Sequence, residues 1–213
     1  MLRKTLVVFS LLGCGDGEAG PSAIPGSSFC PADADVFEPS AAPGDDAPLA
    51  EIPAPGSTCG AVEREYAIEA SPHVPDCSLV SYPSDPPTSG AHYSHWAAFQ
   101  SYGIPVPRGF YVHAMEHGAV VLLYSCSDCA DEVAAAQAMI DQLPVDPLCT
   151  ADVARRVILS PDPLLEVRWA AAAWGFSVES DCFEPEVFSA FVQAHYAAGP
   201  ENFCSGGVFP EGS

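Results

Sequence analysis

Residues 118–143 read GAVVLLYSCSDCADEVAAAQAMIDQL and decide the fold class. The first part, Gly118 to Tyr124, is a continuous apolar run, which predicts a buried β-strand. From Ala130 to Leu143 apolar residues recur at helical spacing behind an acidic start, which predicts a helix. Further predicted elements are strands at 62–69, 110–113, 155–159 and 164–174 and helices at 93–102 and 184–198. This order predicts an α/β or α+β domain in which helices pack on a small mixed sheet.

Two short motifs upstream of the apolar run concentrate the chemistry of the chain. Residues 86–96 read PPTSGAHYSHW, and residues 112–118 read VHAMEHG. Together they hold four of the six histidines of the chain, with a glutamate and a methionine. Histidine is the commonest metal ligand and the usual acid or base near neutral pH, so this clustering predicts a single site.

The conformation of residues 113–117 determines which chemistry the second motif supports. In a helix, His113 and His117 would share one face beside Glu116, which is the inverted zincin signature of a metalloprotease. In an extended segment His113, Met115 and His117 would project together, and two imidazoles with a thioether suit copper. The residues before the motif favour β-structure and a glycine opens the strand after it. We therefore expect a turn or extended segment, and we do not expect a metalloprotease.

The predicted site is a transition-metal centre, for which copper is favoured and zinc is the alternative. The expected ligands are His92, His113 and His117, with Met115 or His95 as an auxiliary ligand. Glu116 and Tyr93 are expected to orient these ligands without binding the metal themselves. We expect binding rather than turnover, so no catalytic residue is assigned.

Other roles are open for the histidines. Those in the motifs could hydrogen-bond loop backbone in a non-catalytic module that mediates interactions in the cell envelope. His73 and His195 lie outside the motifs, and for them we expect structural roles alone.

Cys126 and Cys129 provide a competing functional hypothesis. The pair follows the apolar strand and opens the helix, as in thioredoxin-like thiol–disulfide oxidoreductases, where the helix N-terminus lowers the pKa of the first thiol. Pro161 or Pro163 could supply a cis-proline before the next strand. Asp128 and the acidic helix start would oppose thiolate formation, and structural disulfides, including a pairing with Cys149, are an alternative.

The start of the chain predicts export. A basic segment and an apolar run precede Cys14, and Leu-Leu-Gly-Cys at this point resembles the bacterial lipobox, in which the cysteine is lipidated. Residues 1–13 are therefore predicted to be a lipoprotein signal peptide, and the apolar run is too short to span a bilayer. Residues 14–58, rich in Gly, Pro, Ala, Ser and Asp, are predicted to form a flexible tether, and residues 59–213 a single globular domain.

Charge and cysteine content agree with this location. The formal net charge is −21, and after the signal peptide only five arginines carry positive charge. Such a chain is repelled by nucleic acid and anionic lipid, so we expect no nucleic-acid partner and membrane contact through the lipid anchor alone. Apart from Cys14 there are eight cysteines, which predict disulfides and an oxidising location, the periplasm or the cell surface.

The two histidine motifs and the Ala-Ala-Trp-Gly sequence at 172–175 resemble the hallmarks of a bacterial domain family of unknown function. The resemblance covers roughly residues 60–200, and members of that family are typically exported or membrane-tethered. His92, His113, Glu116 and His117 fall on the pattern of the family. His95 and Met115 are not fixed parts of it. The resemblance implies no particular reaction.

Overall fold

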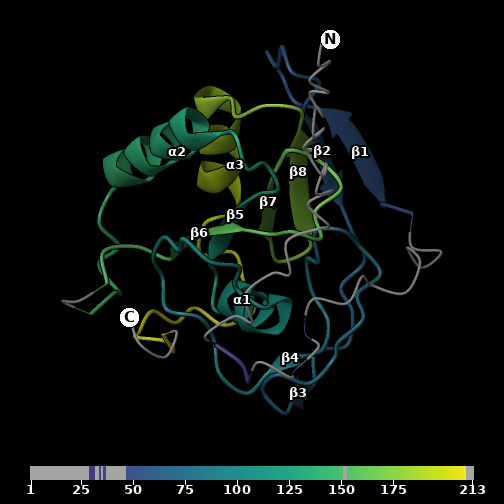
Figure 1. Cartoon of the computed structure of the whole chain (residues 1–213), viewed down its shortest axis with the longest axis vertical. Helices are drawn as coiled ribbons and strands as arrows, with labels where there is room; N and C mark the ends of the chain where they lie inside the picture. The colour runs from purple at the N-terminus through teal and green to yellow at the C-terminus, as the bar shows by residue number, and fades with distance from the viewer. Residues whose placement is uncertain (1–28, 32–33, 35, 37–46, 151–152, 210–213) are drawn as a thin grey trace, which may run out of the picture.

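The computed structural model describes residues 29–31, 34, 36, 47–150 and 153–209 (Figure 1). The predicted signal peptide, the predicted lipidation site Cys14 and much of the predicted tether lie outside these residues. The elements follow in the order β1 (Ala50–Pro53), β2 (Val62–Glu65), β3 (His73–Val74), β4 (His92–Tyr93), α1 (Arg108–Glu116), β5 (Val120–Tyr124), α2 (Ala130–Gln142), β6 (Val157–Pro161), β7 (Trp169–Ala173), β8 (Phe176–Ser180) and α3 (Pro185–His195). None of the helices in this part of the chain has the length and apolar character needed to cross a membrane.

Six strands form a mixed sheet in the order β1-β2-β8-β7-β5-β6, and β3 and β4 form a separate two-stranded sheet. In the large sheet β5 and β6 are parallel, whereas the other neighbouring strands are antiparallel. The helix α2 connects β5 to β6, and the hairpin β7–β8 leads into α3. The prediction of a mixed sheet with helices packed on it is confirmed.

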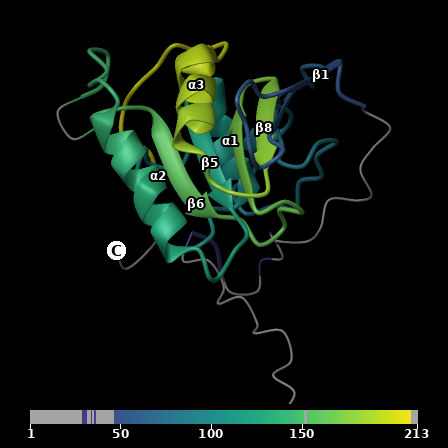
Figure 2. The same ribbon diagram turned by 90° about the horizontal axis from the view of Figure 1, so that it is seen from above.

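Both faces of the sheet are covered. Val120 and Leu122 of β5 pack in one apolar cluster with α2 and α3, whereas Val121 and Leu123 pack in a second cluster with α1. Figure 2 shows α2 and α3 together on one side of the sheet. Because alternate side chains of β5 enter two different cores, the strand is a continuous apolar run rather than an alternating one.

The conformation of the second histidine motif differs from the prediction. Residues 108–116 form α1, and all nine side chains of this helix are buried. The β-structure that we expected for residues 110–113 and the turn or extended segment that we expected for residues 113–117 are therefore wrong as far as residue 116. The β-branched and aromatic residues have a β-preference that is overridden because the helix is enclosed by the sheet on one side and by β4 on the other.

Two smaller expectations are also wrong. Residues 93–102 form no helix. The backbone of this segment instead forms isolated β-bridges with distant residues, Ala97 with Val208 and Ser101 with Leu159. Among the described residues the cis peptide bond precedes Pro86, so neither Pro161 nor Pro163 supplies the expected cis-proline.

Four disulfides connect the domain. They are Cys30–Cys77, Cys59–Cys182, Cys126–Cys129 and Cys149–Cys204. The prediction of a disulfide-stapled domain is confirmed, and such a disulfide content fits an exported protein. Cys149 does not pair with the Cys-x-x-Cys segment, and Cys30–Cys77 links a residue of the predicted tether to the domain. The sheet starts at β1, upstream of the predicted domain boundary at Cys59.

Candidate metal centre

Three short segments position the centre. β3 and β4 pair in parallel with His73 opposite His92, so two imidazoles lie side by side on adjacent strands. The helix α1 packs against β4 and carries His113 and Glu116, which are three residues apart and share a helix face. The close approach of α1 depends on Gly109, because a Cβ at this position would lie 2.7 Å from the ring of Tyr93.

Four potential ligands converge where these segments meet. One ligand atom from each of His73, His92, His113 and Glu116 lies within 4.8 Å of the other three. The ring centroids of the three imidazoles are 4.7 to 4.9 Å apart. A tetrahedral zinc ion with ligand bonds of about 2.0–2.1 Å needs donor atoms about 3.4 Å apart, so the clustered donor atoms would have to move closer together to hold one.

The backbone fixes the ring orientation of the two buried imidazoles. His92 Nδ1 lies 2.9 Å from the carbonyl oxygen of Gly90, and His113 Nδ1 lies 2.7 Å from that of Tyr93. A carbonyl oxygen only accepts hydrogen bonds, so each Nδ1 carries the proton and each Nε2 of a neutral ring presents a lone pair. Metal-binding histidines characteristically donate their second ring nitrogen to such an acceptor.

His92 Nε2 is the most informative atom of the cluster. The His92 side chain is fully buried, and this nitrogen has no hydrogen-bond partner although it lies 3.1 Å from Glu116 Oε2. The two atoms are close enough for an ion pair, but their relative orientation does not allow a hydrogen bond. A buried lone pair facing a carboxylate oxygen at this distance is unfavourable unless a proton or a cation lies between them.

Burial keeps His113 neutral. Desolvation is the main cause that lowers the pKa of His113 to about 4, the neighbouring imidazoles add to it, and the hydrogen bond to Tyr93 opposes it. At neutral pH the His113 Nε2 lone pair is therefore available to a metal ion. His73 differs from its partners because 54% of its side chain is exposed, which leaves the centre open to solvent on that side.

The structure places His117 in a neighbouring group. His117 caps the C-terminus of α1, and its Nε2 lies 3.2 Å from Glu201 Oε2. Glu116, His117 and Glu201 have ligand atoms within 4.8 Å of one another, so Glu116 belongs to both groups. The His117 ring packs against Trp96 at 4.5 Å between centroids, and burial lowers its pKa despite the nearby carboxylates.

Two predicted auxiliary ligands lie apart from the cluster. Met115 is fully buried in the apolar cluster beneath α1 and lies two residues from His113, which is the opposite side of a helix. His95 is exposed and pairs with Asp76 at 2.6 Å. His195, expected to be structural, stacks on Phe176 and lies 3.0 Å from a carboxylate oxygen of Glu63.

Tyr93 and Glu116 contribute differently from one another. Tyr93 holds the His113 ring through its carbonyl oxygen, while its hydroxyl donates to the carbonyl oxygen of Ser78. Glu116 lies among the ligand atoms rather than behind them. His73 is the candidate ligand that sequence reasoning missed, since we expected a structural role for it. Its segment, flanked by prolines, carries no motif, and its pairing with His92 depends on tertiary structure.

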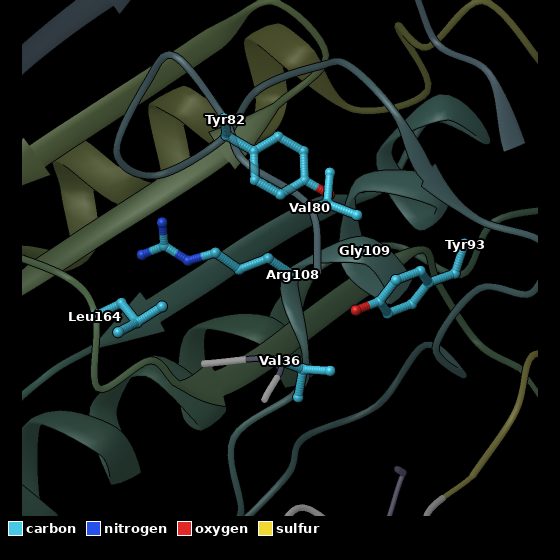
Figure 3. Close-up of a pocket in the computed structure, with 7 residues that line it drawn as sticks. All are labelled: Val36, Val80, Tyr82, Tyr93, Arg108, Gly109 and Leu164. Atoms are coloured by element: carbon cyan, nitrogen blue, oxygen red, sulfur yellow. The ribbon is translucent and has the colours of Figure 1, made fainter. Parts of the chain in front are cut away.

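A pocket lies at the other end of α1, around Arg108 (Figure 3). It is lined by Val36, Val80, Tyr82, Tyr93, Arg108, Gly109 and Leu164. The Arg108 guanidinium already pairs with Asp85 at 2.5 Å and with Asp162 at 3.0 Å. With this charge neutralised internally, the pocket offers no free ionic group, and the histidine cluster remains the principal candidate site.

Comparison with known proteins places the chain in a family. Neither a curated protein nor a solved structure matches it. Residues 73–206 match the family described as protein of unknown function (DUF3105). The matched region begins at His73 and includes all four clustered ligands. The chain therefore belongs to the DUF3105 family.

Proposed function

We propose that this domain binds one divalent transition-metal ion through His73, His92, His113 and Glu116. The observation that carries the proposal is His92 Nε2, which is buried, has no hydrogen-bond partner and faces Glu116 Oε2 at 3.1 Å. A bound cation turns this unfavourable contact into a shared ligand pair. The backbone hydrogen bonds that fix the His92 and His113 rings support the same role.

The donor set favours zinc as the bound ion, with copper(II) as its competitor. The expectation of copper rested on the nearby Met115 and on the predicted export, and Met115 lies in the apolar core instead of among the clustered ligands. Three imidazoles and one carboxylate are nitrogen and oxygen donors that suit zinc, whereas copper(II) binds most such sites more tightly. Four protein ligands fill a tetrahedral shell, so the proposed function is binding rather than turnover.

A metalloprotease is not proposed, although the His-x-x-Glu-His motif starts on a helix after all. That mechanism needs both histidines of the motif on one metal and the glutamate free to act as a base. Here His117 groups with Glu201, and Glu116 is itself among the clustered ligand atoms. We further propose that metal binding takes place outside the cytoplasm on a lipid-anchored protein. The four disulfides support the location outside the cytoplasm.

Metal content after loading tests the proposal. The full chain is incubated with equimolar zinc and copper, freed of excess metal, and measured by elemental analysis beside His92→Ala, Glu116→Gln and the control His95→Ala. We expect one metal ion per chain for the unmodified protein and for the control, and loss of the ion from the other two variants. An unmodified protein without metal, or a control that loses metal equally, would refute the assignment.

A further inference from the structure

The Cys126–Cys129 disulfide differs from the other three in what it connects. Its cysteines are three residues apart, whereas the other pairs join positions separated by 47, 123 and 55 residues. It lies between β5 and α2, at the opposite end of β5 from the histidine cluster. It therefore joins no distant segments, and its role in holding the fold together is small.

The surrounding topology places this disulfide at the edge of the sheet where the parallel strands end. β5, α2 and β6 form a parallel strand–helix–strand unit, and the antiparallel pair β7–β8 leads into α3. Open α/β sheets bind their ligands beyond the carboxyl ends of such strands. Cys126 follows β5 by two residues, and Cys129 is the N-cap of α2.

The two sulfur atoms differ in accessibility. Cys126 is half-buried between exposed neighbours, Ser125 and Ser127, whereas Cys129 is 4% exposed. Cys126 Sγ lies 4.0 Å from the carbonyl oxygen of Arg168, at the start of β7. Cys126 is therefore the more exposed of the two cysteines to an incoming thiolate.

Arg168 offsets part of the acidic charge beside the disulfide. Its guanidinium pairs with Asp128 at 3.0 Å and with Glu132 at 2.6 Å. Hydrogen bonding to Arg168 is the main cause that lowers the pKa of Glu132, so this carboxylate is committed to the arginine. Asp128 and Glu132, two of the acidic residues that we expected to oppose a Cys126 thiolate, are thus paired with a cation, and α2 begins at its N-cap Cys129, three residues from Cys126.

We propose that Cys126–Cys129 is an exchangeable disulfide that accepts two electrons from a protein dithiol. The substrate thiolate attacks Cys126 Sγ, the Cys126–Cys129 bond breaks, and the Cys129 thiolate leaves and takes up a proton. The second thiolate of the substrate then attacks the substrate sulfur that is bonded to Cys126. This step releases the Cys126 thiolate, which also takes up a proton. The substrate becomes a disulfide and the protein a dithiol, and the exchange is reversible. The proposal does not depend on the metal centre.

Mixed-disulfide trapping tests the proposal on the full chain. Cys129→Ser leaves Cys126 free, and Cys126→Ser leaves the buried Cys129 free as the matched control. Each variant is incubated with oxidised glutathione and mapped by peptide-resolved mass spectrometry. We expect glutathione on Cys126 at a rate at least tenfold above that on Cys129. Equal rates, or no adduct on Cys126, would overturn the assignment of Cys126 as the exchanging sulfur.

Equilibration in glutathione buffers supplies a second measurement that needs no substitution. We expect the Cys126–Cys129 pair of the unmodified chain to be reduced while the other three disulfides remain intact. A pair that resists reduction until the other disulfides have opened would rule out exchange.

Arg168 is assigned as a positioning residue in this exchange. In reduced protein the alkylation rate of Cys126, measured against pH, should shift to higher pH in Arg168→Gln and return in Arg168→Lys. A purely structural arginine would leave this pH profile unmoved, so an unchanged profile removes Arg168 from the proposal.

Discussion

His73 is the residue whose role differs most between sequence and structure. It has no motif around it, yet it lies opposite His92 and its Nε2 is 3.9 Å from Glu116 Oε2. We predict that His73→Ala weakens zinc binding by at least about tenfold, because it removes one of four ligands. The side chain is half exposed, so the substitution should leave the free energy of unfolding of the metal-free chain nearly unchanged. Calorimetric titration and chemical denaturation measure the two quantities.

The control for this prediction is His117. This residue lies outside the four-ligand set although it belongs to the motif, and it pairs with Glu201. We expect His117→Gln to retain one zinc ion per chain. If His117→Gln abolished binding and His73→Ala did not, the ligand set would have to be redrawn around His117.

Asp146 carries a pH-dependent contribution to stability. It accepts hydrogen bonds from the buried Arg156 guanidinium, the Tyr196 hydroxyl and the backbone of Leu148. Burial opposes ionisation here, but these hydrogen bonds prevail and lower the pKa of Asp146 below its usual value of 3.8. A carboxyl whose pKa is lower in the folded state stabilises the fold above its unfolded pKa, and this stabilisation is lost as the pH falls through the folded pKa.

We predict that Asp146→Asn lowers the free energy of unfolding by about 3–5 kcal/mol at pH 7, because it leaves Arg156 buried without its anionic partner. The difference from the unmodified protein should shrink as the pH falls from the unfolded pKa of about 3.8 through the lower folded pKa, below which the native Asp146 is itself protonated. Urea denaturation at a series of pH values measures this dependence. A difference that stays constant down to pH 2 would mean that the charge of Asp146 is not the cause.

At the scale of elements, the contact between α1 and β4 sets the geometry of the centre. Gly109 permits this contact, since an added Cβ would meet the Tyr93 ring at 2.7 Å. We predict that Gly109→Ala separates α1 from β4, lowers stability by about 1–3 kcal/mol and weakens metal binding. The matched control is Gly103→Ala, because a Cβ at Gly103 would meet no atom within 4 Å. Equal metal affinity in both variants would show that the centre does not depend on this contact.

The elements that the sequence predicted well are those specified by a local pattern. The apolar run gives β5, and the helical spacing of apolar residues gives α2 and α3, each within a few residues of its observed ends. The helix α1 has no such pattern, because all of its faces are buried and its apolar residues do not form a stripe. Because an extended conformation was expected for this segment, Met115 was predicted to lie on the same side as His113 and His117 and was included among the expected ligands.

The pairing of β3 with β4 could not be predicted for a related reason. Each strand has two residues, which is too short for any periodicity to be visible. Their pairing brings His73 beside His92 only because the chain between them returns past α1. A site assembled from such short segments can be located from its histidine motifs, as His92, His113 and Glu116 show, but its full ligand set depends on tertiary contacts.

At the scale of the whole molecule, three disulfides join residues far apart in the sequence, whereas the fourth joins residues three positions apart. In the chain-entropy view, stabilisation grows with the length of the loop that a disulfide closes. Cys59–Cys182 closes a separation of 123 residues and ties the start of β2 to the end of β8. Cys126–Cys129 closes a separation of three.

We predict that replacing Cys59 and Cys182 by serine lowers the free energy of unfolding by about 5 kcal/mol, and that replacing Cys126 and Cys129 lowers it by about 2 kcal/mol. Differential scanning calorimetry of both double variants measures the contrast. Similar losses in the two proteins would assign Cys126–Cys129 a structural role that its short loop does not suggest.

The Cys30–Cys77 disulfide has a mechanical consequence for a protein held by its N-terminal end. Cys77 lies four residues after His73, so the covalent route from Cys30 into the folded domain enters beside a proposed metal ligand. The alternative route runs through the whole chain from Cys30 to β1, where the large sheet begins. On a protein held by the proposed lipid anchor, tension would therefore be transmitted first to the strand that carries His73, and the affinity of the proposed metal site would depend on the force on the predicted tether.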